Sequence, residues 1–328
     1  MTEHRPVVVT DHLSKRYGPV SALDALTLRV DPGITGVVGV NGAGKSTLIK
    51  ILLGLLPATA GTVEVLGRDP GAEGRDIRAL VGYMPEHDCL PADVSAADFV
   101  LHMALMSGLP RQASRERASD VLRHVGLDEE RHRAMGGYST GMKQRAKLAQ
   151  ALVHDPALVF LDEPTSGLDP RARDDMLDLI ARVHADFGIS VVVTSHLLGE
   201  LERTADSIVV LDSGRLLRAS RTSDLTQSTG TVVVEVLGPP GSDRALGQAL
   251  LDRGVTAWPA GTDVEVRIER PEDLDAVRDA AVDLDLGLVR VQERRHTLDE
   301  VFHTPLRRPS PPTPEDRTHD LSPAQRHP

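Results

Sequence analysis

The sequence predicts an α/β domain with a phosphate-binding loop, followed by a small α+β domain. Almost uninterrupted apolar runs at Leu158–Leu161 and Val191–Thr194 are typical of parallel strands buried on both faces. Val37-Val38 leads into a glycine-rich loop and then a helical pattern, the strand–loop–helix order of a phosphate-binding unit. From residue 225 onward, strand and helix patterns follow the order of a split βαβ unit. We therefore expect one sheet with a ligand site at its edge and a separate accessory domain.

The first part of the chain is expected to contain several strands around one helix. Val7–Val9 and Leu26–Val30 are strand-like, and Asp31-Pro32-Gly33 supplies a turn. A helix is expected to begin at Lys45 and to present a broad apolar face. Two glycines then enclose a further strand at Thr62–Leu66.

The middle of the chain is expected to insert a helical subdomain, about residues 87–147, into the α/β domain. Ala96–Met106 and Ala113–Val125 have the spacing of amphipathic helices with charged outer faces. After the buried strands resume, Ile208–Leu211 and Arg215–Leu217 are expected to pair as a hairpin.

A domain boundary is predicted near Ser223–Gly230, which gives an α/β domain at 1–224 and an accessory α+β domain at 225–303. The accessory domain is predicted to be ferredoxin-like, with strands at 231–237, 255–259, 263–269 and 287–293 and helices at 242–253 and 272–284. Residues 304–328 contain seven prolines and few apolar side chains, so they are expected to be a disordered tail.

Composition limits the possible partners and compartment. The formal net charge of −11 argues against a nucleic-acid-binding protein. A single cysteine, Cys89, rules out an intrachain disulfide and fits a reducing compartment. No apolar run approaches the roughly 20 residues needed to cross a bilayer, and the N-terminus lacks the apolar core of a signal peptide. We expect a cytoplasmic protein, which would work beside a membrane rather than within it.

The glycine-rich loop meets the pattern of a nucleotide phosphate site through Gly39, Gly44, Lys45 and Ser46. Backbone N–H groups of Asn41-Gly42-Ala43 and Gly44 can curl around an anion at the start of the following helix. Lys45 is expected to reach the β- and γ-phosphates of ATP, and Ser46 to bind Mg²⁺. Thr47 is expected to help hold the α-phosphate. The alternative is a glycine-rich turn without a ligand.

Two acids at the end of the second buried strand are candidates for metal binding and catalysis. Asp162 lies at the carboxyl end of Leu158–Leu161, where open α/β sheets bind ligands, and can hold Mg²⁺. Glu163 can instead face the attacking water as general base or as the group that positions it. The alternative for this pair is a favourable charge at a helix N-terminus.

The segment Tyr138-Ser139-Thr140-Gly141-Met142, placed before the acid pair, resembles the signature motif of ATP-binding cassette (ABC) ATPases. The resemblance covers about residues 7–220. It implies that two copies clamp ATP head to tail: Ser139 and Gly141 of one copy would contact the γ-phosphate held by the other. Asp169 would couple the two ATP sites; its alternative is a helix N-cap before Pro170.

The resemblance assigns two further ATP contacts. His196, which follows the strand Val191–Thr194, matches the family's switch histidine and would contact the γ-phosphate and orient the water. Tyr17 matches the aromatic residue that stacks on adenine. The alternatives are an ordinary surface histidine and a core tyrosine.

The chain departs from the family pattern at its signature and in the loop after Gly82. Tyr138 and Met142 look like the branch that drives exporters, whereas Thr140 in place of glycine is less usual. Glu86 stands where the family has a glutamine that helps bind Mg²⁺, and its carboxylate adds a negative charge near the γ-phosphate. We expect Glu86 to take part in Mg²⁺ binding and catalysis, with modest ATPase activity.

Taken together, the resemblance implies the ATP-binding and ATP-hydrolysing subunit of an ABC transporter, with export favoured. It would bind ATP and Mg²⁺, form an ATP-bridged homodimer and drive a separate membrane permease from the inner face of the cell membrane. The alternatives are a non-transport ABC ATPase and an ATP-sensing module. Only about 95 residues separate Lys45 from Ser139, without the heptads of a long coiled coil. The sequence does not identify the cargo.

Overall fold

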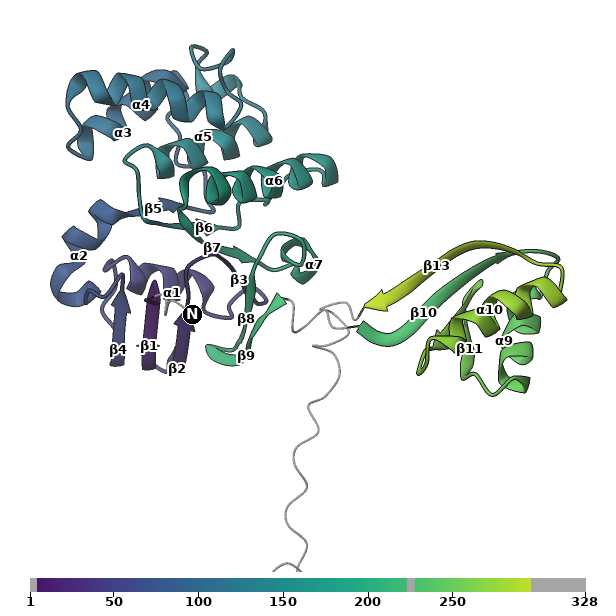
Figure 1. Ribbon diagram of the computed structural model, residues 1–328. Coiled ribbons are helices and arrows are strands. Elements are labelled where there is room, and N and C mark those ends of the chain that lie inside the picture. The colour runs from purple at the N-terminus through teal and green to yellow at the C-terminus, as the bar shows by residue number, and fades with distance from the viewer. Residues whose placement is uncertain (1–4, 223–227, 296–328) are drawn as a thin grey trace, which may run out of the picture.

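The computed structural model describes residues 5–222 and 228–295 (Figure 1). Its described strands form a six-stranded sheet, a three-stranded sheet and a four-stranded sheet. The four-stranded sheet belongs to the C-terminal part of the chain, and the other two share the part that precedes residue 223. The predicted boundary segment lies partly outside the described residues, and the predicted tail at 304–328 lies wholly outside them.

The six-stranded sheet carries the phosphate-binding loop. Its strand order is β5-β6-β7-β3-β8-β9, with β5 (Val81–Met84), β6 (Leu158–Asp162), β7 (Ser190–Ser195), β3 (Ile34–Val38), β8 (Ser207–Asp212) and β9 (Arg215–Arg221). The pairs among the first five are parallel, and β9 pairs antiparallel with β8. Every residue of β3, β6 and β7 is buried, which confirms the predicted buried parallel strands. The antiparallel pair of β8 and β9 confirms the predicted hairpin.

The three-stranded sheet covers the first helix. Strands β2 (Val20–Val30), β1 (Val8–Tyr17) and β4 (Ala60–Val65) pair antiparallel in that order. Helix α1 (Lys45–Leu52) packs its buried Ile49 with Leu13 of β1 and with Phe160 of β6 in one apolar cluster. Strand β1 is longer than the strand predicted at Val7–Val9. The prediction ended early because bulges and polar residues interrupt the alternation in the second half of β1.

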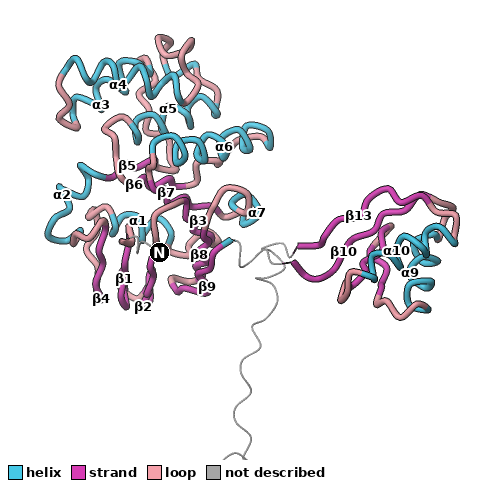
Figure 2. The backbone as a smooth tube through the Cα atoms, viewed as in Figure 1, coloured by secondary structure: helices cyan, strands magenta, loops and turns pink. Residues whose placement is uncertain are grey.

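A second core lies on the helical side of the six-stranded sheet. It joins α3 (Ala96–Met106), α4 (Arg111–His124), α5 (Thr140–Leu152) and α6 (Pro170–Phe187). Shorter elements complete this part of the chain: α2 (Pro70–Leu80), the 3₁₀ turn Met135–Gly137 and α7 (Leu198–Leu201). Figure 2 shows α3, α4 and α5 gathered at one end, away from the three-stranded sheet. The prediction for 96–106 is confirmed, and the helix predicted at 113–125 begins two residues earlier.

The C-terminal sheet has the order β11-β12-β10-β13, with every neighbouring pair antiparallel. Its elements are β10 (Ser228–Leu237), α9 (Ser242–Asp252), β11 (Ala257–Ala260), β12 (Asp263–Arg267), α10 (Glu272–Asp283) and β13 (Gly287–Arg295). Val234, Leu246 and Val264 lie in the fully buried core between this sheet and its helices. This is the predicted ferredoxin-like arrangement, so the fold class is confirmed.

The start of α3 shows a helix cap that mutation can test. Ser95 Oγ accepts a hydrogen bond from the backbone N–H of Asp98 at 3.1 Å and donates to its carboxylate at 2.6 Å. Replacing Ser95 by alanine removes both bonds and should lower the free energy of unfolding by about 1 kcal/mol. Urea unfolding monitored by circular dichroism would measure this. Ser107→Ala, which removes a hydroxyl at the other end of α3, should have a smaller effect, and equal losses would contradict the cap.

Candidate functional site

The phosphate-binding loop joins β3 to α1 and lines a cavity of about 430 Å³. Gly42 and Gly44 have φ values of 85° and 105°, which favour glycine. A Cβ at Gly44 would lie 2.6 Å from the carbonyl oxygen of Ala22, so this position also needs glycine for space. No side chain caps the N-terminus of α1, which leaves first-turn N–H groups available to an anion. The predicted loop residues Asn41, Gly42, Ala43, Gly44, Lys45, Ser46 and Thr47 all line this cavity.

Lys45, Glu163 and His196 form a continuous chain of polar contacts beside the loop. The ammonium of Lys45 lies 3.2 Å from Oε1 of Glu163 and donates to the carbonyl of Gly39 at 2.5 Å. Nδ1 of His196 lies 2.8 Å from Oε2 of Glu163. The Lys45 and Glu163 side chains are each only 7% exposed, whereas His196 is 49% exposed. Glu163 and His196 directly follow β6 and β7, and Lys45 begins α1 after the loop that leaves β3; these three strands are neighbours in the sheet.

The backbone of Glu163 is held in an unusual conformation. Its φ is 50°, a left-handed value that costs a non-glycine residue about 1 kcal/mol or more. Its N–H donates to Oγ1 of Thr194 at 3.0 Å, and that hydroxyl donates to Oδ1 of Asp162 at 2.8 Å. Thr194, on the neighbouring strand, therefore orients both acids.

The residues predicted to bind Mg²⁺ have suitable chemistry but do not form a closed cage. Ser46 and Glu86 line the cavity, whereas Asp162 is buried at its hydrogen bond to Thr194. The described residues contain no cluster of three or more His, Cys, Asp or Glu side chains placed to hold a metal ion. Mg²⁺ commonly takes one or two carboxylates and obtains its other ligands from water and substrate phosphates. The oxygen donors here fit such a shared site.

The residues predicted to act across a dimer lie away from this cavity. Ser139 caps α5, its Oγ accepting from the N–H of Met142 at 3.3 Å. Asp169 caps α6 in the same way, accepting from the N–H of Ala172 at 2.9 Å. The helix N-cap given as the alternative role of Asp169 is therefore present. A Cβ on Gly141 would meet no atom closer than 3.9 Å. The proposed roles of these three residues towards a second copy stay predictions.

Tyr17 ends β1 and is 47% exposed, with the ammonium of Lys15 5.2 Å from its ring centre. It does not line the cavity around Lys45. A half-exposed ring is compatible with stacking on a base, and its role towards adenine stays a prediction.

Sequence reasoning missed two residues that organise the site. Glu200, at α7, accepts hydrogen bonds from Thr165 and Ser195 at 2.9 Å each and pairs with Arg173. Glu200 therefore connects the segment that follows Glu163 with the residue that precedes His196. The other is Lys147, whose buried ammonium bonds to two backbone carbonyls beside Glu86. Polar residues at helical spacing, Lys143, Lys147, Gln150 and His154, are the signal that could have found Lys147.

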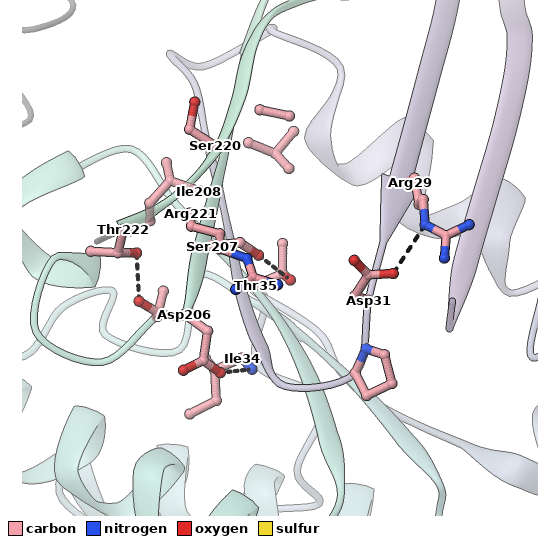
Figure 3. A pocket seen from close by; sticks show the side chains of 14 residues that line it. Arg29, Asp31, Ile34, Thr35, Asp206, Ser207, Ile208, Ser220, Arg221 and Thr222 are labelled. Atoms are coloured by element: carbon pink, nitrogen blue, oxygen red, sulfur yellow. Dashed lines mark hydrogen bonds and ion pairs between the residues drawn. The ribbon is translucent and has the colours of Figure 1, made fainter. Parts of the chain in front are cut away.

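A second cavity, of about 650 Å³, lies at the opposite edge of the sheet (Figure 3). It is lined by the amino ends of β3 and β8, and its polar groups largely satisfy one another. Asp206 accepts from the N–H of Ile34 at 2.8 Å, and the hydroxyls of Thr35 and Ser207 lie 2.9 Å apart. Ligands of open α/β sheets bind at the carboxyl ends of strands, so the cavity at Lys45 is the candidate site.

Comparisons with known proteins agree with this geometry. A family model described as ABC transporter matches residues 23–166. The daunorubicin resistance ATP-binding protein DrrA3 of Streptomyces coeruleorubidus is 34% identical over 303 residues, which cover 90% of this chain and 94% of that protein. The Nod factor export ATP-binding protein I of Burkholderia orbicola (strain AU 1054) is 36% identical, with 70% and 75% covered. The bacitracin transport ATP-binding protein BcrA of Bacillus licheniformis is also 36% identical, with 64% and 68% covered.

Solved structures with the same fold include an ATP-binding subunit of an ABC transporter, with a TM-score of 0.60 and 28% identity. It covers 67% of this chain and 91% of its own. Another is cbiO1 from Clostridium perfringens, part of the ABC transporter complex cbiONQ, with a TM-score of 0.62 and 24% identity over 67% and 90% of the two chains. Among the described residues of the present chain, no helix has the length and apolar character to cross a membrane.

Proposed function

Because this chain belongs to the ABC transporter family of ATP-binding subunits, which are ATPases coupled to transport, we propose that it drives export through a separate membrane permease. The relatives are named for daunorubicin resistance, Nod factor export and bacitracin transport, and this supports export as the direction. The contact chain from Lys45 through Glu163 to His196 carries the proposal on the structural side, because it gathers a phosphate-binding cation and a base at one cavity.

Glu163 has the surroundings of a general base. One carboxylate oxygen is held by His196 and the other by Lys45, so its orientation is set from both sides. An incoming γ-phosphate would compete with Glu163 for Lys45, and this exchange would leave Oε1 free to accept a proton from water. His196 would keep the carboxylate oriented through Oε2. Bound Mg²⁺ would neutralise charge on the phosphate oxygens, with Ser46, Asp162 and Glu86 as its protein ligands.

The signature residues are suitable for contact with a second copy. Ser139 uses an oxygen lone pair in its cap, so its O–H remains available to donate to a phosphate. Gly141 lies in the first turn of α5, where N–H groups have no partner within the helix. We propose that two copies close head to tail around two ATP molecules, with Asp169 between the sites. Hydrolysis would then reopen the dimer and move the permease.

The helices between the phosphate loop and the signature argue against a chromosome-architecture or DNA-repair ATPase. Helices α3 and α4 contain only 11 and 14 residues, far shorter than a long coiled coil. An ATPase assay together with co-purification from detergent extracts tests the proposal. ATP turnover and a bound multi-span membrane protein are expected. Absence of ATP binding would overturn the ATPase role, and turnover without any membrane partner would overturn the transport role.

Replacing Glu86 by glutamine should change the Mg²⁺ dependence of the ATPase. Glu86 lines the phosphate cavity, and a carboxylate binds a hard cation more strongly than an amide does. We expect Glu86→Gln to raise the Mg²⁺ concentration for half-maximal activity by about threefold or more. It should also raise the rate at saturating Mg²⁺, because the negative charge that opposes the attacking hydroxide is removed.

Mg²⁺ titrations of ATPase activity at saturating ATP would measure this effect. Glu64→Gln is a matched control, since Glu64 is an exposed acid on β4. Superimposable titrations for wild type and Glu86→Gln would remove the basis for assigning Glu86 to the metal.

A further inference from the structure

Side chains of α5 form hydrogen bonds with the segment that leads to Glu86. Polar side chains of α5, and of His154 just after it, bond in turn along β5 and the loop that follows. The contacts are His154 with the carbonyl of Val81 at 3.1 Å, Gln150 with that of Tyr83 at 2.9 Å, Lys147 with those of Pro85 and Glu86 at 2.8 and 2.9 Å, and Lys143 with the carboxylate of Asp88 at 2.8 Å. Because α5 also begins with the signature residues, these hydrogen bonds connect the signature helix to the backbone of Glu86.

Lys147 differs from the other side chains of this set in being a buried cation. It is only 3% exposed, and its ammonium bonds to two neutral carbonyls. Among the side chains that the structure describes, at 5–222 and 231–292, no carboxylate lies within 4.0 Å of the Lys147 ammonium. Burial lowers the pKa of Lys147, and the negative charges of Asp88, Glu86 and Asp162 act in the opposite direction. A buried cation without an ion-pair partner is costly, so a purely structural role would be served better by a neutral side chain.

The positive charge of Lys147 lies where it can act on Glu86. Lys147 holds the backbone of Glu86, the residue whose side chain lines the phosphate cavity. Glu86 brings a negative charge to a place where the family has a neutral glutamine. A cation fixed behind the same peptide offsets that charge: Glu86 is exposed, but the ammonium of Lys147 is buried, so their attraction acts partly through protein and is screened less than in water.

We propose that Lys147 is a positioning residue for Glu86: its ammonium fixes the peptide of Glu86 against the signature helix and offsets the charge of the Glu86 carboxylate at the phosphate cavity. This inference rests on the proposed ATPase function. It makes Glu86 and Lys147 a functional pair, although 61 residues separate them and their side chains form no ion pair. The pair explains how an added carboxylate can stand beside the phosphates without abolishing their binding.

A double-mutant cycle tests this pairing. In the chain with Glu86, Lys147→Met should lower kcat by about tenfold, because the contact to the peptide of residue 86 and the charge that offsets its carboxylate are both lost. It should also weaken binding of a fluorescent ATP analogue, more strongly without Mg²⁺ than with it, because the uncompensated Glu86 carboxylate then faces phosphates whose charge no metal ion neutralises. In the Glu86→Gln background, the same substitution should lower kcat by no more than about threefold. Lys50→Met, which removes an exposed lysine from α1, should leave all these quantities unchanged.

The melting temperature of each variant shows whether a loss of kcat comes from unfolding or from a displaced Glu86 in a folded protein. If Lys147→Met is too unstable to purify, Lys147→Gln retains an amide donor without the charge and should show the same dependence on residue 86. Equal kcat losses in the two backgrounds, or a loss matched by Lys50→Met, would overturn the pairing while leaving the ATPase proposal intact. A wild-type chain that neither binds nor hydrolyses ATP would overturn both.

Discussion

Replacing Glu163 by glutamine should reduce ATP hydrolysis by about 10²-fold or more, the usual contribution of a general base. The amide cannot accept a proton from water, although it keeps nearly the size and shape of the carboxylate. ATP affinity should not fall, because the substitution removes the anion that competes with phosphate for Lys45. The protein should therefore accumulate with ATP bound, and in the proposed mechanism it should accumulate as a dimer.

Two measurements check this expectation. Steady-state ATPase assays give the rate, and size-exclusion chromatography with light scattering at saturating Mg-ATP gives the mass. Glu64→Gln removes an exposed carboxylate and should behave as wild type in both. Hydrolysis by Glu163→Gln at the wild-type rate would show that another group is the base. A monomer at saturating Mg-ATP, with or without the permease, would contradict the shared-site proposal.

Replacing Lys45 by alanine should weaken ATP binding by about 10²-fold or more, because charge-assisted hydrogen bonds to phosphate are lost. Lys45 is also the cation paired with buried Glu163. Its removal should lower stability as well, by about 3 kcal/mol, since an unpaired buried charge remains. Isothermal titration with ATP and urea unfolding measure the two effects.

A double variant separates these two effects of Lys45. Lys45→Ala combined with Glu163→Gln removes both charges and should recover most of the lost stability without recovering ATP binding. Lys50→Ala, on the exposed side of the same helix, should leave both properties unchanged. Wild-type affinity in Lys45→Ala would exclude the phosphate role, and unchanged stability would show that the Lys45–Glu163 pair contributes little.

The parts predicted well are those in which local sequence and local structure coincide. The buried strands at Leu158–Leu161 and Val191–Thr194 appear as β6 and β7, because such continuous apolar runs are stable only when both faces are covered. Strand β1 was predicted only in part, since its bulges and polar residues break the two-residue repeat that identifies a strand. The contacts of Glu200 were not predicted, because they join α7 to residues on three other segments.

By itself the sequence determined the phosphate-binding loop, the acids after β6 and the family, because these depend on residue types at short, fixed spacing. Only the tertiary structure decided that Lys45 meets Glu163 across 118 positions of the chain, and that His196 reaches the same carboxylate from β7. It alone showed that Lys147 is buried behind Glu86. The physical reason is that burial and pairing depend on which strands become neighbours and which face of α5 they cover. Those relations arise from packing between distant segments, so the spacing of residues along the chain does not specify them by itself.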